Sequence, residues 1–221
     1  YGYIQERGVK VATTLGTRIE HNPPEHVAKL LNELLVYADP IYIGIHENTG
    51  ATTPEAWRYY MKKIRASLVK DVPIIPHIHN MLGGGTMSAV AAVTGGARGL
   101  DLTMNGIAIH CGLAAMEEVV VILEVLYGIE TGINLEKLRD YSKVVVEATG
   151  IDVHPNKPIV GDHAFIVELE PFVKDVVEGR TLGQERVHMI APSLVGHANE
   201  VVWGENTIHG PATKAKLTAL G

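Results

Sequence analysis

Short apolar runs rich in β-branched residues alternate with longer amphipathic stretches through the first 150 residues of the chain. Runs of this kind, bounded by Gly, Pro and Asn, are typical of β-strands. The longer stretches have apolar residues at the helical period of three and four positions, which predicts α-helices. The predicted strands are Val9–Thr14, Pro40–Ile45, Pro73–His79 and Gly99–Met104.

The predicted helices have explicit start and stop signals. Asn22-Pro23-Pro24 supplies an N-cap and a proline for the first turn of one helix, and Thr53-Pro54 repeats the pattern. Three further helices are predicted at Thr86–Thr94, Ala114–Tyr127 and Leu135–Ala148, the first two ended by glycine.

Strands that alternate with helices at this spacing form βαβ units, and therefore a parallel sheet. A closed (β/α)8 barrel needs about 250 residues, so four strands correspond to half of a TIM barrel or to a small open sheet. We assign residues 1–150 to this α/β domain. Beyond it, HPNKP at His154–Pro158 is a stiff connector, and weak periodicity predicts a small helical and irregular appendage over residues 151–221.

Composition narrows the class of function. A hydrophobic fraction of 46% is ample for a buried core and excludes a disordered chain. The net charge of −6, without a Lys/Arg block, argues against nucleic acid or an anionic membrane as the main partner. No apolar run reaches the length of about 18 residues that a membrane span requires. Cys111 is the single cysteine and cannot form an internal disulfide, so we expect a reducing, cytoplasmic environment.

Two histidines end the third predicted strand, in the sequence His77-Ile78-His79-Asn80. Because side chains alternate along a strand, His77 and His79 point to the same side. Ligands bind at the carboxyl ends of parallel strands, and two imidazoles there form half of a divalent metal site. The alternative is a pair of histidines that only hydrogen-bond to loops. The position at a strand end favours the metal site.

Other polar residues follow the neighbouring strands. Glu47 and Asn48 come after the second strand and could contact substrate or metal, or belong to a turn with a solvated carboxylate. Asn105 follows the fourth strand and offers an oxygen or an amide at the same edge. His110 and Cys111 precede a helix, where a Cys beside a His can be an activated thiolate. The alternative for Cys111 is simple burial among small residues.

Several segments together resemble the DRE-TIM metallolyase superfamily. These segments are VKVATT, IYIGIHENTGATTPE, IPHIHNMLGGGTMSAVAAVTGGARGLDLTMNG and AAMEEVVVILEVLYGIETGINLEKL. The superfamily includes isopropylmalate, citramalate and homocitrate synthases, hydroxymethylglutaryl-CoA lyase and 4-hydroxy-2-oxovalerate aldolase. The tail segments HPNKPIVGDHAF and SLVGHANEVVWGENTIHGPATKAKLTALG are similar to the subdomains that follow the barrel in isopropylmalate synthases.

The resemblance implies a fold and a metal centre. It implies the later part of a TIM barrel, within strands 4 to 8, with the four predicted strands as the fourth to seventh. A divalent cation (Mg, Mn, Co or Zn) would be held by His77 and His79, together with an Asp from a first strand that this sequence does not contain. Asn48 would occupy a substrate-contacting position, and Asn80 belongs to the HxHN motif. The first three strands would come from preceding residues or from a second polypeptide, and a homodimer is expected.

The resemblance also implies an activity. The first expectation is an acyltransferase of the isopropylmalate or homocitrate synthase type, which condenses acetyl-CoA with a 2-oxo acid at the metal. A second is a lyase or aldolase that cleaves such a bond in a 2-hydroxy acid. Cys111 favours the lyase, because it resembles the cysteine of the lyase loop. A third is a catalytically silent homologue with a structural or regulatory role.

Some positions depart from the synthase pattern. Leu113 stands where the family has an Asn ligand, and Ile109 and His110 replace a Glu and an Arg. His110 is then a candidate for a third ligand. The segment Leu169–Phe172 replaces the synthases' serine-glycine-isoleucine-histidine motif, so that Phe172 stands at the place of their catalytic His. A leucine cannot bind a metal and a phenylalanine cannot carry a proton.

Overall fold

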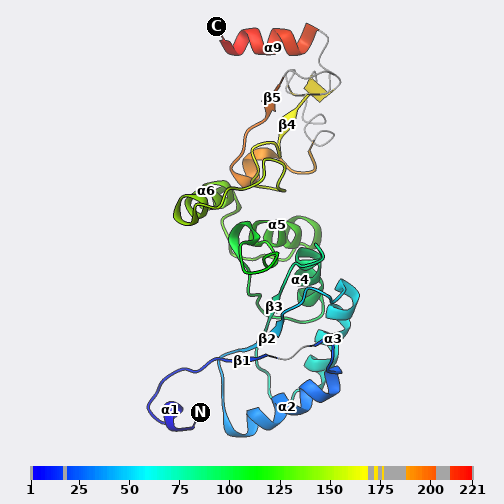
Figure 1. Cartoon of the computed structure of the whole chain (residues 1–221), viewed down its shortest axis with the longest axis vertical. Coiled ribbons are helices and arrows are strands. Elements are labelled where there is room, and N and C mark those ends of the chain that lie inside the picture. The colour runs from blue at the N-terminus through cyan, green and yellow to red at the C-terminus, as the bar shows by residue number, and fades with distance from the viewer. Residues whose placement is uncertain are drawn as a thin grey trace. The chain divides into compact units, whose positions relative to one another are not determined.

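The computed structural model describes residues 2–16, 19–168, 172–173, 176, 188–202 and 210–220 (Figure 1). The chain divides into two compact units, Tyr1–Thr131 and Gly132–Gly221. The sequence pattern predicted a division of the chain at residue 150. The two units instead divide before helix α6 (Leu138–Thr149), which falls in the second unit. No helix in the described part of the chain combines the length and apolar character that crossing a bilayer requires.

The first unit has a parallel sheet with helices between its strands. The strands are β1 (Thr13–Leu15), β2 (Ile43–Glu47) and β3 (Ile74–Ile78), paired in this order. The helices are α1 (Gly2–Gln5), α2 (Pro24–Tyr37), α3 (Pro54–Ser67), α4 (Gly85–Thr94), the 3₁₀ helix η1 (Met104–Gly106) and α5 (Met116–Tyr127). The predicted α/β class with parallel strands is therefore confirmed, in the form of a sheet with free edges among the described residues.

The fourth predicted strand, Gly99–Met104, is not a regular strand. Its backbone pairs first with β3 and then with a later segment, through isolated bridges from Asp101 to His77 and from Thr103 to Ala115. The chain then turns, because Asn105 has a φ of 63° inside η1. The segment runs along the edge of the sheet and therefore has the alternation of a strand in its sequence. It does not form a continuous hydrogen-bond ladder with β3.

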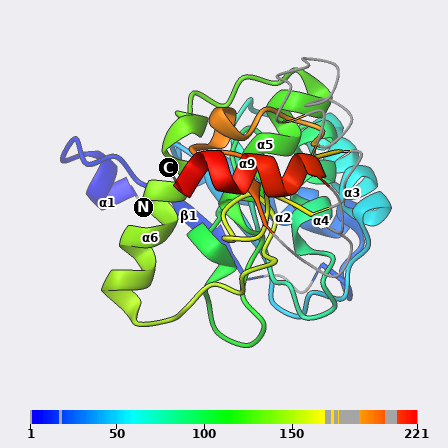
Figure 2. The same cartoon turned by 90° about the horizontal axis from the view of Figure 1, so that it is seen from above.

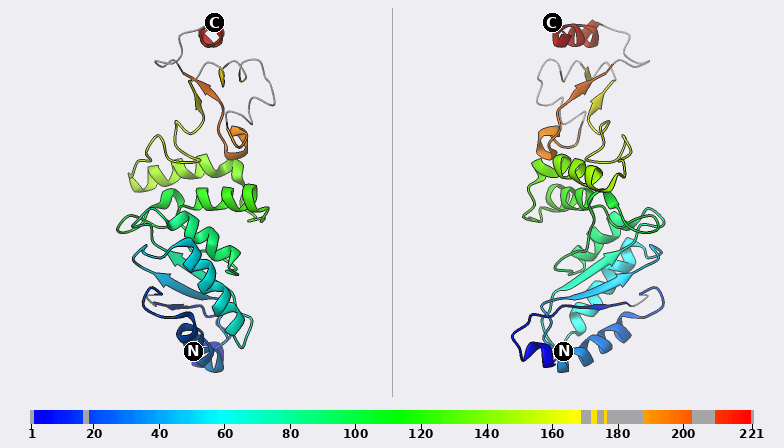
Figure 3. Two further views of the ribbon diagram at one scale, coloured as in Figure 1. Left: turned by 90° about the vertical axis from the view of Figure 1, so that its right-hand side faces the viewer. Right: turned by 60° about the vertical axis from the view of Figure 1, so that its left-hand side comes forward.

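Helices cover one face of the sheet. Along β3, Ile74, Pro76 and Ile78 are buried, whereas Ile75 and His77 between them are only partly buried. The buried face packs against apolar residues of α2, α3 and α4, among them Leu31 and Trp57. Figure 3 shows these three helices on the same side of the strands. The opposite face has the polar side chains of His46 and His77, which are register partners.

The helix ends confirm some sequence signals and correct another. Thr53 caps α3, since its side chain accepts a hydrogen bond from the backbone N–H of Ala56. The predicted N-cap at Asn22 is wrong, because α2 begins after Pro23, which leaves the cap without a side-chain bond. Helix α1 lies at the periphery of the first unit (Figure 2), where the side-chain amide of Gln5 bonds the backbone of Asp39.

The second unit contains short elements and a small core. The elements are the 3₁₀ helices η2 (Leu135–Lys137) and η3 (Pro192–Val195), helices α6 and α9 (Gly210–Leu220), and the parallel strands β4 (Ile166–Val167) and β5 (Glu200–Val201). Val167 and Val173 form an apolar cluster against which Phe172 packs. The predicted helix at Leu135–Ala148 therefore begins with a 3₁₀ turn before α6.

Candidate functional site

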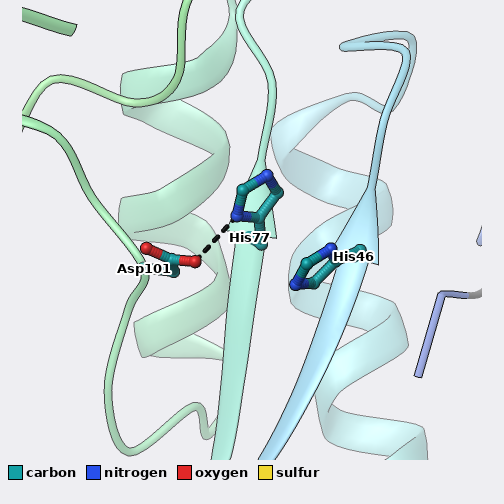
Figure 4. A group of neighbouring side chains, drawn as sticks. All are labelled: His46, His77 and Asp101. Carbon is teal, nitrogen blue, oxygen red and sulfur yellow. Dashed lines mark hydrogen bonds and ion pairs between the residues drawn. The ribbon is translucent and has the colours of Figure 1, made fainter. Parts of the chain in front are cut away.

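Three polar side chains lie in one row across the exposed face of the sheet (Figure 4). His46 on β2 is the register partner of His77 on β3, and His77 bridges to Asp101 on the next segment. Partners in parallel register project to the same face, so the three side chains are neighbours. Their ligand atoms all lie within 4.8 Å of one another. His79, two residues beyond His77, projects from the same face toward the strand end.

His77 is held by two polar contacts. Its Nδ1 lies 2.8 Å from Oδ2 of Asp101, and its Nε2 lies 3.3 Å from Nε2 of His79. A carboxylate only accepts hydrogen bonds, so the proton in the first contact belongs to Nδ1 of His77. In the neutral ring the lone pair then lies at Nε2, on the side of His79.

His79 is a neutral imidazole at physiological pH. Only 4% of the residue is exposed. Burial, followed by the nearby rings of His77 and His110, holds the pKa of His79 below its ordinary value. A neutral imidazole keeps a lone pair for a cation, which metal binding requires.

The spacing of His77 and His79 fits a bound metal ion. A zinc ion binds imidazole nitrogens at about 2.0–2.1 Å with tetrahedral angles, which places two such nitrogens roughly 3.3–3.4 Å apart. The Nε2 atoms of His77 and His79 are 3.3 Å apart. The Nδ1 atom of His79 is buried and has no hydrogen-bond partner among the described residues. The separation of the two Nε2 atoms thus suits two adjacent ligands of one ion.

His46 packs flat against His77 instead of converging with it. The two ring centroids are 4.1 Å apart and the ring planes differ by 16°. An imidazole binds a metal in the plane of its ring, so nearly parallel stacked rings cannot direct their lone pairs to one ion. Burial, and then the neighbouring His77, lowers the pKa of His46 below its ordinary value. The geometry therefore favours His77 and His79 as the ligand pair, with His46 beside them.

The loop before α5 brings His110 near this pair. The ring centroid of His110 lies 5.8 Å from that of His79. The backbone of His110 has a φ of 57°, which is uncommon for a residue other than glycine. The backbone N–H of Asn80 donates to the carbonyl of Gly112, which fixes the loop to the end of β3. Cys111 is exposed, so the alternative of a buried structural cysteine is wrong.

Glu47 faces away from this row. It alternates with His46 along β2 and is fully buried on the helix-covered side. Its Oε1 accepts hydrogen bonds from both the backbone N–H and the hydroxyl of Thr49, and from the N–H of Ala51. The contact with substrate or metal predicted for Glu47 stays a prediction, since the carboxylate is buried on the helix side while its charge still acts on His79. The carboxylate braces the loop between β2 and α3.

The three predicted substrate-binding asparagines have different surroundings. Asn48 is exposed in the loop after β2. Asn80 uses its side-chain oxygen to accept a 2.8 Å hydrogen bond from the N–H of Gly85, at the start of α4. The backbone N–H of Asn105 donates to the buried Glu117 at 2.9 Å. Asn48 is thus open to a ligand, whereas the Asn80 side-chain oxygen already accepts a bond within the protein.

The departures from the synthase pattern also have structural counterparts. Leu113 is buried, and its backbone pairs with that of His79. The residue beside this candidate ligand is therefore apolar. Phe172 packs in the apolar cluster of the second unit, and Leu169–Pro171 lie outside the described residues.

Sequence reasoning missed His46 and Asp101. Both lie in segments predicted as strands or at their ends, and the signal that could have found them is the register. Pairing His46 with His77, and His77 with Asp101, requires knowing how far neighbouring strands are offset. The sequence pattern does not contain that offset.

Comparison with known proteins places this geometry in a family context. The HMGL-like family model matches residues 2–145. The chain is 37% identical over 222 residues to homocitrate synthase AksA of Methanopyrus kandleri, covering 99% of this chain and 53% of that protein. It is 35% identical over 222 residues to 2-isopropylmalate synthase of Methanocaldococcus jannaschii, covering 99% of this chain and 40% of that protein.

A structural comparison agrees on the fold. The HMG-CoA lyase of Bacillus subtilis matches with a TM-score of 0.57 at 23% identity, over 68% of this chain and 53% of that structure. The chain therefore corresponds to part of that lyase's barrel, and it spans about half the length of the curated relatives it matches. The matched family model covers well over half of the sequence, and the chain belongs to the HMGL-like family.

Proposed function

We propose that the chain forms part of the active site of a metal-dependent enzyme that makes a carbon–carbon bond next to a 2-oxo acid. The observation that carries the proposal is the 3.3 Å separation of the Nε2 atoms of His77 and His79, which suits two ligands of one divalent cation. When bound, such a cation polarises the carbonyl oxygen of a 2-oxo acid. His77 and His79 hold it at the end of β3, and the exposed Asn48 is a candidate to contact the substrate.

The synthase type of reaction is the first choice within this class. Relatives named homocitrate synthase and 2-isopropylmalate synthase match 99% of the chain, which supports condensation of an acyl-CoA, such as acetyl-CoA, with a 2-oxo acid. Because the chain spans only 53% and 40% of these two relatives, the remaining ligands would come from residues outside it. The homodimer and the cytoplasmic location stay predictions.

Two observations favour the other candidates. The exposed Cys111, next to His110 on the loop that reaches His79, supports a lyase or aldolase that runs the cleavage direction. The apolar Leu113 and Phe172 support a silent homologue, since neither side chain can do the chemistry of the family residue at its place. The synthase and the lyase both require the metal, and the silent homologue does not.

Metal content separates the enzymes from the silent homologue. We expect the chain, together with the rest of the barrel, to bind Mn²⁺, Co²⁺ or Zn²⁺ at one ion per chain, measured by elemental analysis after dialysis. His77→Ala should abolish this binding because it removes one of two adjacent ligands. The matched control is His26→Ala, which removes an exposed histidine of α2. A wild-type chain without metal, or a His77→Ala chain with full metal content, contradicts the proposal.

Product analysis then separates synthase from lyase. The chain, together with the rest of the barrel, is incubated with acetyl-CoA and a panel of 2-oxo acids while free thiol is measured. Release of CoA that depends on the acid supports condensation. Cleavage of a 3-hydroxyacyl-CoA into an acyl-CoA and a carbonyl compound, or of a 4-hydroxy-2-oxo acid into a 2-oxo acid and an aldehyde, without thiol release from acetyl-CoA, supports the lyase or aldolase.

A further inference from the structure

Asp101 has no assigned role, although it makes the shortest polar contact of the candidate site. Its Oδ2 lies 2.8 Å from Nδ1 of His77, on the side of the ring away from His79. The side chain of Asp101 is 52% exposed, and that of His77 is 17% exposed. Nothing in the sequence alone connects the two residues, which are 24 positions apart.

We propose that Asp101 is a positioning residue that fixes the tautomer and the orientation of His77 for metal binding. The inference rests on the proposed metal centre and extends it by one residue. Neutral imidazole has two tautomers, and only the form with the proton on Nδ1 leaves the Nε2 lone pair for a cation beside His79. Because the Asp101 carboxylate can only accept, it selects that form.

Two further contacts restrict the His77 ring in the same sense. The ring of His46 stacks on one face at 4.1 Å, which limits tilting of the plane. The backbone of His77 is paired on both sides, with His46 on β2 and with Asp101 on the neighbouring segment. The sheet and His46 therefore restrict the plane of the His77 ring. Within that plane, the hydrogen bond to Asp101 selects the orientation in which Nδ1 points to Asp101 and Nε2 to His79.

A carboxylate in this position also strengthens the ligand. Metal-bound histidines commonly donate their other N–H to a carboxylate, which raises the basicity of the ligating nitrogen, and loss of this partner costs 10- to 100-fold in metal affinity. His79 lacks such a partner at its Nδ1 among the described residues. His77 is thus the oriented ligand of the pair.

The first experiment reads the tautomer in the metal-free chain by long-range ¹H–¹⁵N correlation of the histidine rings. We expect the His77 proton on Nδ1 in the wild type. In Asp101→Ala it should move largely to Nε2, and in Asp101→Asn, whose amide oxygen still accepts a hydrogen bond, it should stay on Nδ1. A wild-type His77 protonated on Nε2, or no difference between the Ala and Asn variants, overturns the proposal.

The second experiment measures Co²⁺ or Zn²⁺ affinity by calorimetric titration. Asp101→Ala should bind about 10- to 100-fold more weakly, and Asp101→Asn should lie between it and the wild type. The control is Asp71→Asn, a carboxylate of the same unit that precedes the start of β3, at the end of the strand away from His77, and that pairs with Arg65 and Arg98. Wild-type affinity in Asp101→Ala overturns the proposal. A wild type that binds no metal contradicts the proposed function instead, and the tautomer measurement still decides the role of Asp101.

Discussion

Gly112 closes the loop that contains His110 and Cys111, and its replacement by alanine tests how tightly this loop is built. Its φ of +83° lies in the left-handed region, which costs an L-residue roughly 1–2 kcal/mol. A Cβ here would lie 1.9 Å from the carbonyl oxygen of Gly106, whereas ordinary contact begins at 3.4 Å. The backbone must therefore shift by about 1.5 Å. That shift breaks the hydrogen bond from the N–H of Leu113 to Gly106.

The expected loss of stability follows from these contacts. The bond from Leu113 to Gly106 and the bond from Asn80 to Gly112 contribute about 1 kcal/mol each. Together with the conformational cost, Gly112→Ala should lower the free energy of unfolding by roughly 3–4 kcal/mol. Gly128→Ala is the matched control, because its φ is +63° and an added Cβ meets nothing within 4 Å. It should lose only about 1–2 kcal/mol.

Equilibrium unfolding in urea, followed by far-ultraviolet circular dichroism, measures both variants against the wild type. The difference between the two variants isolates the steric term, since both glycines share the left-handed backbone. Equal losses in Gly112→Ala and Gly128→Ala would refute the reasoning. They would mean that the loop shifts without cost and does not hold His110 in place.

Two further predictions concern buried polar groups. Glu47→Ala should lower the unfolding free energy by about 2–4 kcal/mol, because the N–H groups of Thr49 and Ala51 lose their acceptor. The control Glu55→Ala, which removes an exposed carboxylate, should stay within about 0.5 kcal/mol of the wild type in the same urea assay. Equal effects of the two substitutions would contradict the bracing role of Glu47. Burial, and then Arg139, lowers the folded-state pKa of His197, so below about pH 6.5 the unfolded chain binds a proton that the folded chain does not. Stability of the second unit should therefore be complete above that pH and fall as the pH drops, which thermal unfolding at pH 7.5 and 5.5 would show. His197→Phe should reduce this loss of stability at low pH, whereas the control His154→Phe, at an exposed position, should leave it unchanged. An equal loss in both variants would show that His197 is not the group responsible.

The sequence predicted the class of fold and the placement of His77 and His79 on one side of a strand because both depend on local periodicity. Alternation along a single strand places His77 and His79 on one side whatever the neighbouring strands do. The same rule, applied to β2, separates His46 from Glu47, yet the sequence does not say which of the two faces the helices. That choice depends on which face is buried, and it is the reason why Glu47 was predicted in the site and His46 was not.

The predicted fourth strand illustrates the same limit from another side. Gly99–Met104 has the composition of a strand, but its backbone divides its hydrogen bonds between β3 and the segment around Ala114. Such pairing depends on residues distant in the sequence, and it also brings Asp101 beside His77. The part of the site that periodicity could not predict, His46 and Asp101, is thus the part that strand register creates.

Strand register also suggests why so divergent a chain can keep the metal pair. His77 is oriented by contacts that come from within the described unit: the Asp101 carboxylate, the His46 ring and the backbone pairing of β2 with β3. None of these contacts uses the side chain of Leu113 or Phe172, where the synthase residues are replaced, and the bridge from His79 to Leu113 involves only the backbone. Loss of those residues removes chemistry from the site without loosening its ligands. In the proposed function the metal centre and the catalytic step are therefore physically separable, and metal affinity is the property that reports on the first without the second.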